Sequence, residues 1–153
     1  MATSELVPAT EAHARAMAPR MRESDVREVQ ASCGYAPLQA LLDALAVSSW
    51  ARALLFDGEV AALVGVAPTG HALIGSAWLL GTEAIREHKR EFLGLCRPTL
   101  EEMLELCPVL CNYVDARNEV SLRWLARLGA VLGAPEPYGA EGLPFVPFLL
   151  RRS

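Results

Sequence analysis

Residues 112–130 read NYVDARNEVSLRWLARLGA and carry the clearest structural signals in the chain. Their apolar start is typical of the end of a buried strand, and Asp-Ala-Arg-Asn at 115–118 is typical of a tight connection. From Asn118 to residue 128, apolar residues recur at helical spacing, and Gly129 is the residue type that most often ends a helix. The stretch therefore predicts a strand, a turn and one amphipathic helix.

Three further strands are predicted upstream, at residues 50–56, 59–67 and 71–80. The dipeptide Asp57-Gly58 separates the first two and indicates a hairpin, because a type I′ turn requires positive φ at both central positions. Gly75 in the third strand predicts a bulge or a close approach to another backbone. We therefore expect an antiparallel meander.

The N-terminal third predicts one short strand, residues 5–8, followed by helices. The first helix, residues 10–18, begins at a Thr and ends at a Pro. The second, residues 24–33, has Ser24 as its expected N-cap, and the third, residues 37–47, has Pro at its first position. Two or three helices thus precede the meander.

A long helix is predicted from Thr82 to residue 107, with Thr82 as its cap. Pro98 lies inside it and predicts a kink or two abutting segments at that point, because Pro removes one backbone hydrogen bond. The next strand, residues 109–114, returns after this helix. A strand, helix and strand in that order usually form a right-handed parallel pair.

The C-terminal part predicts a helix over 118–128, a brief strand over 130–132, a Pro- and Gly-rich loop over 133–144 and a last strand over 145–150. The whole order indicates a mixed α/β fold with helices on both faces of one sheet.

Length and composition limit the class of protein. The 153 residues, 52% hydrophobic and 21% charged, predict one globular domain spanning 1–153. The formal net charge of −4 argues against nucleic-acid binding, which needs a basic surface. No apolar run approaches the roughly 18 residues of a membrane helix, and the N-terminus lacks a continuous apolar signal segment, so we expect a cytoplasmic protein with no membrane association.

No metal site is predicted. The four cysteines form no C-x-x-C pair and share no ligand spacing with the histidines; they are Cys33, Cys96, Cys107 and Cys111. In a cytoplasmic chain such cysteines act as small buried apolar residues.

The order of elements, together with Asn118, Ser121, Gly129 and Ala130, resembles the GCN5-related N-acetyltransferase (GNAT) family. Asn118 lies at the helix start where that family typically has Asn, and Gly129 follows at the matching distance. The resemblance covers nearly the whole chain.

Four short phrases resemble a phage-encoded branch of this family, often described as an internal virion protein of T7-like phages. The phrases are WLLGT at 78–82, NYVDARN at 112–118, RWL at 123–125 and GLPF at 142–145. This resemblance implies other phage virion proteins as partners, and a place in the host cytoplasm or inside the packaged virion.

The GNAT resemblance implies a mostly antiparallel sheet with a splayed parallel strand pair and acetyl-CoA in the resulting cleft. It implies that Leu79, Leu80, Gly81 and Thr82 present backbone groups to this cofactor, with Asn118 at the start of the facing helix. Free backbone N–H groups at a helix start favour phosphate, which explains why the family binds pyrophosphate there.

This sequence departs from the family pattern at the phosphate-binding turn. Residues 81–86 hold one glycine where the family has two or three. Glu83 places a carboxylate in the first helical turn, where it favours an empty helix end over a polyanion, and Arg86 can offset part of that charge.

No catalytic residue is assigned. Leu125 stands where many GNAT members have a Tyr that protonates the leaving thiolate, and no acid lies within residues 71–80. The nearest acids are Glu83 and Asp115, both typical of turn and helix-start positions. The remaining candidates for acid or base are His71, Tyr113 and Tyr138.

Two functions remain open. One is an acyl-CoA-dependent N-acyltransferase. The other is a non-catalytic phage virion or assembly component that uses the GNAT fold as an interaction module, with the 133–147 loop and Tyr138, Phe145 and Phe148 as its contact surface. A third, a small-molecule binder that reuses the cleft, has less support.

Overall fold

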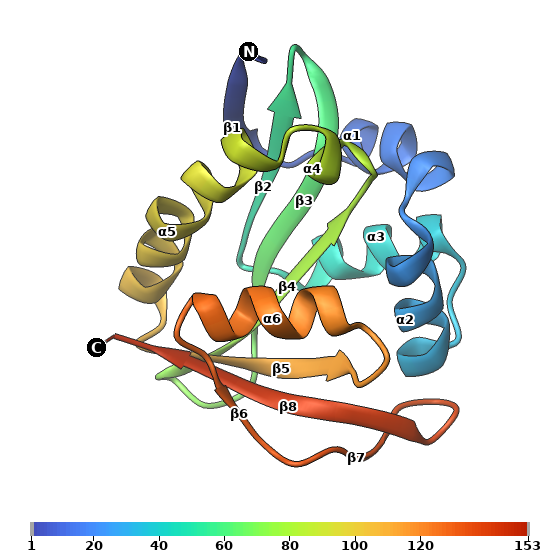
Figure 1. The fold of residues 1–153 in the computed structure, drawn as a ribbon, viewed down its shortest axis with the longest axis vertical. Coiled ribbons are helices and arrows are strands. Elements are labelled where there is room, and N and C mark those ends of the chain that lie inside the picture. The colour runs from blue at the N-terminus through green and yellow to red at the C-terminus, as the bar shows by residue number, and fades with distance from the viewer. Residues whose placement is uncertain (1, 153) are drawn as a thin grey trace.

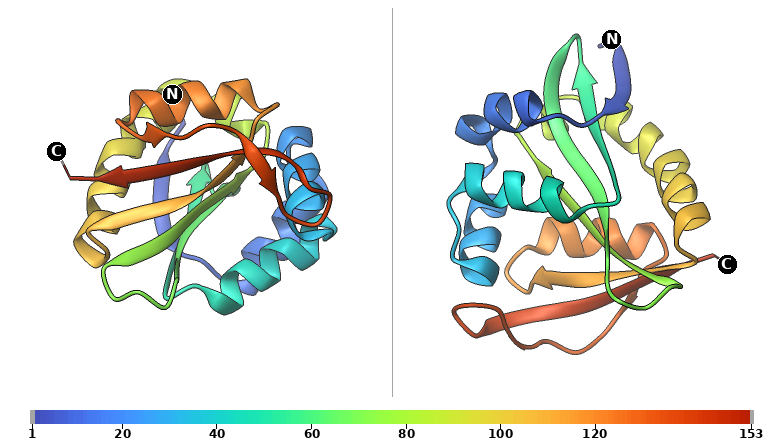
Figure 2. Two further views of the ribbon diagram at one scale, coloured as in Figure 1. Left: turned by 90° about the horizontal axis from the view of Figure 1, so that it is seen from below. Right: turned by 180° about the vertical axis from the view of Figure 1, so that it is seen from behind.

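The computed structural model describes residues 2–152, and the chain forms an eight-stranded sheet flanked by helices on both faces (Figures 1 and 2). The strands are β1 (Ser4–Pro8), β2 (Trp50–Phe56), β3 (Glu59–Pro68), β4 (Ile74–Gly81), β5 (Val109–Asp115), β6 (Val131–Leu132), β7 (Glu136–Tyr138) and β8 (Leu143–Arg151). The α-helices are α1 (Glu11–Met17), α2 (Glu23–Cys33), α3 (Pro37–Val47), α4 (Ala84–Glu87), α5 (Lys89–Leu106) and α6 (Glu119–Arg127), and a 3-10 helix covers Ala18–Arg20. None of the described helices is both long and apolar enough to span a membrane.

Strands β2 to β4 form the predicted antiparallel meander, and β1 pairs antiparallel with β2 at its edge. Asp57 and Gly58 have φ of 51° and 82°, which confirms a hairpin turn with positive φ at both positions. Helices α1 and α3 cover one face of the meander, where Met17, Leu41 and Leu63 are fully buried. Figure 2 shows α5 and α6 on the opposite face.

The start of α2 differs from the prediction. The helix begins at Glu23, its N-cap is Arg22, and Ser24 does not cap it. The physical reason is that the Arg22 N–H donates to the Gly81 carbonyl at 2.9 Å, so the end of β4 fixes where this helix starts. Gly34 ends α2 with φ of 76°, as a glycine C-cap does.

The predicted long helix is broken at His88, not at Pro98. Short helix α4 ends there, and α5 continues unbroken through Pro98. His88 packs on the Phe56 ring at 4.8 Å and pairs with Glu91 at 3.5 Å, which holds the break against the sheet. Inside α5, Thr99 donates its hydroxyl to the Leu95 carbonyl at 2.7 Å beside the proline.

Gly75 allows side chains, not backbone, to approach closely. A Cβ at this position would lie 2.6 Å from Val66 Cγ1 and 2.9 Å from Cys107 Sγ. No bulge occurs there, since Gly75 pairs in register with Pro68. Strand β4 also begins at Ile74, later than predicted, because the preceding residues form a turn closed by Ile74 N–H on the His71 carbonyl.

Strand β5 follows the helical crossover and pairs in parallel with β4, as predicted. On its other edge it pairs antiparallel with β8, which also carries β6 and β7. Strand β7 lies inside the segment 133–144 that the sequence predicts as a loop. Its residues 136–138 pair with the beginning of β8, so three residues of the predicted loop form a short strand.

Candidate functional site

The parallel strands β4 and β5 separate partway along their length. They pair only from Ile74 to Ser76 against residues 109–111. Immediately beyond, the Asn112 side chain donates to the Ala77 carbonyl at 2.8 Å and marks the narrow end of the gap. The sheet therefore contains the splayed pair that the sequence resemblance implies.

The backbone of Leu79 faces this gap. The Thr82 N–H donates to the Ala61 carbonyl on β3 at 2.9 Å, which fixes which residues of β4 bond to β3. In an antiparallel pair, backbone groups alternate between the two edges, so Leu80 faces β3 whereas Leu79 faces β5. Leu79 thus offers backbone groups where the neighbouring strand has moved away.

Helix α2 spans the wide end of the gap and holds the end of β4. The Asp25 carboxylate accepts the Gly81 N–H at 2.8 Å and the Arg22 Nε at 2.7 Å. Because the Arg22 N–H also bonds the Gly81 carbonyl, both backbone groups of this glycine are used inside the protein. Asp25 is 1% exposed.

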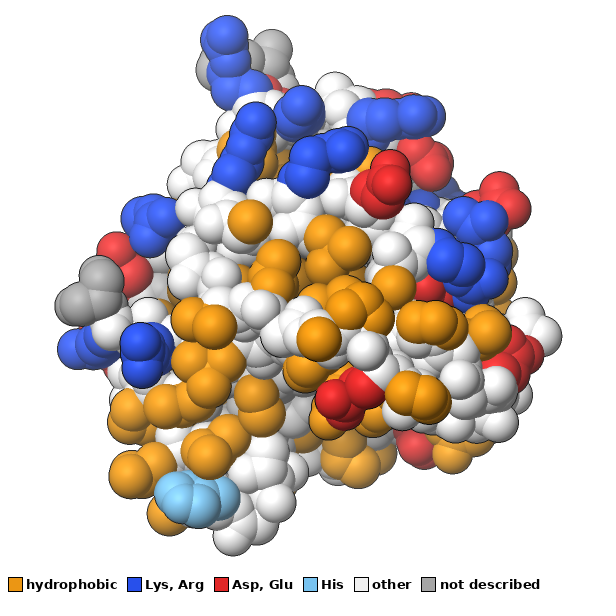
Figure 3. All heavy atoms as spheres, turned by 60° about the horizontal axis from the view of Figure 1, so that its bottom comes forward, with side chains coloured by type: hydrophobic (Ala, Val, Ile, Leu, Met, Phe, Trp, Pro, Cys, Tyr) orange, Lys and Arg blue, Asp and Glu red, His pale blue; other side chains and the backbone are white. Residues whose placement is uncertain are grey.

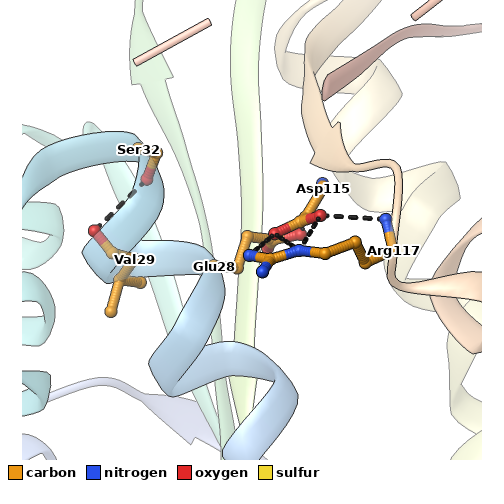
Figure 4. Close-up of polar contacts among 5 residues, drawn as sticks. All are labelled: Glu28, Val29, Ser32, Asp115 and Arg117. Carbon is orange, nitrogen blue, oxygen red and sulfur yellow. Dashed lines mark hydrogen bonds and ion pairs between the residues drawn. The ribbon is translucent and has the colours of Figure 1, made fainter. Parts of the chain in front are cut away.

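The same helix holds the end of β5 (Figure 4). Glu28 Oε1 accepts the Asp115 N–H at 2.8 Å. The Asp115 carboxylate in turn accepts Arg117 Nη2 at 2.7 Å and Nε at 3.0 Å. One turn later, the Ser32 carbonyl accepts the Ala140 N–H at 2.9 Å, so α2 also fixes the loop between β7 and β8.

The three carboxyl groups have different electrostatic environments. Burial raises the pKa of Glu28 to about 7, and the Asp115 N–H only partly opposes this effect. Burial likewise raises the pKa of Asp25, against the lowering effect of Arg22. Burial acts to raise the pKa of Asp115, but the hydrogen bonds from Arg117 outweigh it and the pKa is lowered. Glu28 is therefore the carboxyl that changes charge near neutral pH.

A cleft of about 630 Å³ opens beside the gap, between α4 and the start of α5 on one side and α6 on the other. It is rich in cations: Arg22, Arg27, Arg86, Lys89, Arg117, Arg123 and Arg127 line it, with Glu83, Asp115 and Glu119 as the acids. This basic lining contrasts with the net charge of −4 of the chain. Such a concentration of positive charge favours a polyanion.

The distribution of charge on the surface is uneven. Figure 3 shows Lys and Arg side chains gathered along the upper border of one face, above a broad area of hydrophobic side chains. Exposed hydrophobic residues of the chain include Leu73, Val131 and Leu132, which are 57%, 54% and 37% exposed.

Three of the five residues predicted to bind cofactor line the cleft: Leu79, Thr82 and Asn118. The other two are directed elsewhere. Leu80 packs in the core beneath α1 and α3, and Gly81 has both backbone groups bonded to α2 residues. Binding of a cofactor by these five residues stays a prediction.

The turn that binds pyrophosphate in the GNAT family is not free here. Both the N–H and the hydroxyl of Thr82 donate to the Ala61 carbonyl, and α4 is only four residues long. Glu83 pairs with Arg86 at 3.1 Å on the surface, so this arginine lies where it can offset part of the unfavourable carboxylate charge. The backbone N–H groups of residues 81, 82, 84, 85 and 86 are all bonded inside the protein, so of this turn only the Glu83 N–H remains to bind a phosphate.

Asn118 has an unpartnered donor. Its side-chain oxygen accepts the Ser121 N–H at 3.2 Å and caps α6. Its Nδ2 is buried and has no hydrogen-bond partner among the described residues. A buried donor without an acceptor costs free energy, and the residue that carries this donor is one of those that line the basic cleft.

Three candidate acids or bases named from the sequence do not line the cleft: His71, Tyr113 and Tyr138. Tyr113 stacks on Tyr138 at 4.0 Å, and Tyr138 in turn packs on Phe145 at 5.2 Å. Glu136 raises the pKa of Tyr113, and burial raises that of Tyr138, so neither phenol is activated. Phe145 is 1% exposed, which corrects its assignment to an exposed contact surface.

Sequence reasoning missed Asp25 and Glu28. They lie on one face of α2 with Val29, at the spacing i, i+3 and i+4, and Asp25 and Val29 are buried. Acids on the inward stripe of a helix were the available signal. Their partners, Gly81 and Asp115, lie so far away in the sequence that no local pattern reveals the contact.

No protein-family model matches the sequence, and no curated protein matches it. Solved structures do match over nearly the whole chain. The ribosomal-protein-alanine N-acetyltransferase from Brucella melitensis is 15% identical, with a TM-score of 0.72 over 97% of this chain and 99% of that one.

Two further structures agree. The GNAT-family acetyltransferase from Streptococcus pneumoniae is 14% identical, with a TM-score of 0.63 over 97% and 98% of the two chains. The protein yncA from Salmonella typhimurium, solved with its cofactor acetyl-CoA, is also 14% identical, with a TM-score of 0.68 over 97% and 93%. The chain therefore has the GNAT acetyltransferase fold, with the splayed strand pair typical of that fold.

Proposed function

We propose that this protein binds an acyl-CoA thioester in the basic cleft and transfers the acyl group to an amine. The observation that carries the proposal is the opening between β4 and β5. There the backbone of Leu79 faces a gap that adjoins a cleft lined by seven cationic side chains. The yncA structure, solved with acetyl-CoA, supports acetyl-CoA as a ligand of this fold.

Side chains take over the phosphate binding that the β4–α4 turn lacks. Four of the cleft cations form no ion pair among residues 2–152: Arg27, Lys89, Arg123 and Arg127. Arg123 and Arg127 stand four residues apart on α6, where two like charges repel each other in the absence of an anion. The unpartnered Asn118 Nδ2 adds a neutral donor for a phosphate or amide oxygen of the cofactor.

Glu28 is the candidate general base. In the reaction, the amine nitrogen attacks the thioester carbonyl carbon, the carbon–sulfur bond breaks and sulfur leaves as a thiolate that takes a proton from solvent. Glu28 does not line the cleft itself but bonds the backbone of Asp115, which does, so its carboxylate accepts the amine proton through intervening water. Its pKa of about 7 suits this role near neutral pH. The Leu79 N–H stabilises the negative charge that develops on the carbonyl oxygen.

Calorimetric titration with acetyl-CoA tests the proposal. We expect saturable binding in the micromolar range, weakened about tenfold by Arg123→Gln, since one charge-assisted contact to phosphate is lost. Arg15→Gln is the matched control, because Arg15 pairs with Glu11 on α1, away from the cleft. Absence of binding at millimolar acetyl-CoA overturns the proposal.

The second candidate is a non-catalytic phage virion or assembly component that contacts other virion proteins, present in the host cytoplasm or packaged. This role is favoured because the backbone N–H groups of Gly81 and Thr82 are already hydrogen-bonded inside the protein and cannot bind the phosphates of a cofactor. Exposed Val131 and Leu132 on β6 offer an apolar contact surface in place of the buried Phe145. Mass spectrometry of purified particles tests this role, and absence of the chain from them removes it.

A further inference from the structure

A small apolar cavity lies between α5, α6 and the sheet. Its volume is about 100 Å³, and its walls include Ala62, Ala77, Cys96, Thr99, Met103 and Leu125. Almost all of its surface is contributed by apolar groups. Apolar cavities of this kind stay dry and accept apolar groups, and one of 150 Å³ holds benzene.

The cavity adjoins the basic cleft. Leu79, Phe92 and Trp124 line both spaces, and the rings of Phe92 and Trp124 lie 5.8 Å apart. The indole Nε1–H of Trp124 donates to Cys96 Sγ at 3.3 Å, which holds the ring in place. The shared wall is thus an aromatic pair beside the residue whose backbone faces the gap.

The cavity also reaches the narrow end of the gap. Ala77, whose carbonyl accepts the Asn112 side chain at the point where the strands separate, is one of its walls. An acyl group held by Leu79 therefore has apolar space next to it. Leu125 contributes an aliphatic side chain to this space, where a phenol would bring a hydroxyl and additional bulk.

We infer that the cavity receives the tail of an acyl group longer than acetyl, of about four carbons. The inference rests on the proposed acyl-CoA function and specifies its substrate class. Acetyl ends at its methyl and leaves the cavity empty, whereas two more methylenes reach into it. A long-chain acyl group exceeds a space about two-thirds the volume of a benzene-sized cavity.

The test compares binding of acetyl-, butyryl- and palmitoyl-CoA to the full chain by calorimetry. Butyryl-CoA is expected to bind on the order of tenfold more tightly than acetyl-CoA, from the transfer of two methylenes out of water. Palmitoyl-CoA is expected to gain nothing over butyryl-CoA. Equal affinity for acetyl- and butyryl-CoA overturns the inference and leaves the proposed function standing, whereas no binding of any thioester overturns both.

Two variants test whether the cavity causes the preference for butyryl-CoA. Ala77→Val fills the cavity from β4 and is expected to remove the preference for butyryl-CoA while leaving acetyl-CoA affinity within about twofold. Ala62→Val fills it from β3 and serves the same purpose if the first variant does not fold. Arg123→Gln is the control: it weakens both thioesters by the same factor, because it acts on the phosphates. A butyryl preference that survives in a folded cavity-filling variant overturns the inference.

Discussion

The ends of β4 and β5 are both held by hydrogen bonds to carboxylates of α2, but they differ in the pairing of those carboxylates. Each end donates a backbone N–H to a carboxylate of α2, Gly81 to Asp25 and Asp115 to Glu28. At the β4 end, Asp25 is also paired with Arg22 at 2.7 Å, and the Gly81 carbonyl is bonded. At the β5 end, Glu28 has no ion-pair partner among the described residues, and its pKa is about 7.

The following helices show the same difference. Helix α4 has four residues and no side-chain cap. Helix α6 is capped by Asn118, which keeps a buried donor unpartnered. At the β4 end both backbone groups of Gly81 are bonded within the protein, whereas the β5 end contains a carboxyl with a raised pKa and a buried amide donor without a partner among the described residues. The β4 end is the more fully bonded of the two, and the proposed reaction uses groups at the β5 end.

Asp25→Ala tests the β4 end and carries the largest expected effect. It leaves Arg22 unpaired in a largely buried position and removes the acceptor of the Gly81 N–H. We expect a loss of about 3–5 kcal/mol in the free energy of unfolding, as for other broken buried pairs. Urea unfolding measures it. A loss below about 1 kcal/mol would mean that the β4 end is not the structural one.

Glu28→Gln tests the β5 end through activity. Glutamine keeps an oxygen that accepts the Asp115 N–H but cannot take a proton, so the gap is preserved and the base is lost. We expect kcat to fall by about 100-fold or more, with acyl-CoA affinity unchanged. In the wild type, kcat rises with pH through about 7, where Glu28 loses its proton.

Asp25→Asn is the matched control, because it retains an acceptor for Gly81 without removing the base. A pH–rate profile of Glu28→Gln that still rises through about 7 assigns the titration to another group and contradicts the role of Glu28.

Glu28→Gln also changes how the stability of the protein depends on pH. The Glu28 carboxyl titrates near 4.5 when unfolded and near 7 when folded, so the folded state binds more protons between these values. Stability from this group therefore falls as pH rises from 4.5 to 7, by about 2 kcal/mol once partial solvent exposure is considered. Glu28→Gln removes that slope. Parallel wild-type and variant curves of unfolding free energy against pH, measured in urea, would contradict the shift.

Asn118→Asp carries the smallest expected effect on folding. Aspartate keeps the oxygen that accepts the Ser121 N–H and favours the start of a helix, so the free energy of unfolding should change by less than about 1 kcal/mol. The variant lacks the Nδ2 donor and adds a negative charge to the cleft. Acetyl-CoA affinity should fall about tenfold or more by calorimetry. Unchanged affinity would show that the donor serves no ligand.

Local signals predicted most of the fold. Asp57-Gly58 predicted the hairpin, and Gly129, with φ of 93°, predicted the end of α6. Both positions require a backbone geometry that few other residues adopt. Prediction was wrong where the surroundings decide. The helix is not divided into two segments at Pro98 but is interrupted at His88, and β7 pairs within a segment whose composition is typical of loops.

The site was less predictable than the fold. Leu79, Thr82 and Asn118 were singled out by the family resemblance and do line the cleft, while their binding of a cofactor stays a prediction. The Arg- and Lys-rich lining could not be found, because Arg27, Lys89 and Arg127 come from three helices distant in the sequence. Asp25 and Glu28 resemble ordinary helix-surface acids until their strand partners are known.

The ties made by α2 also bear on how the chain folds. Asp25 bonds the N–H of a residue 56 positions away, and Glu28 bonds the N–H of one 87 positions away. The Ser32 carbonyl at the end of α2 bonds the Ala140 N–H, which lies near the C-terminus. Contacts of such long sequence separation form slowly, since a large loop must close first. A chain emerging from the ribosome completes its N-terminal helices early, but α2 can dock fully only after the last hairpin has been synthesised. The wide end of the gap is therefore among the last parts of the molecule to take shape.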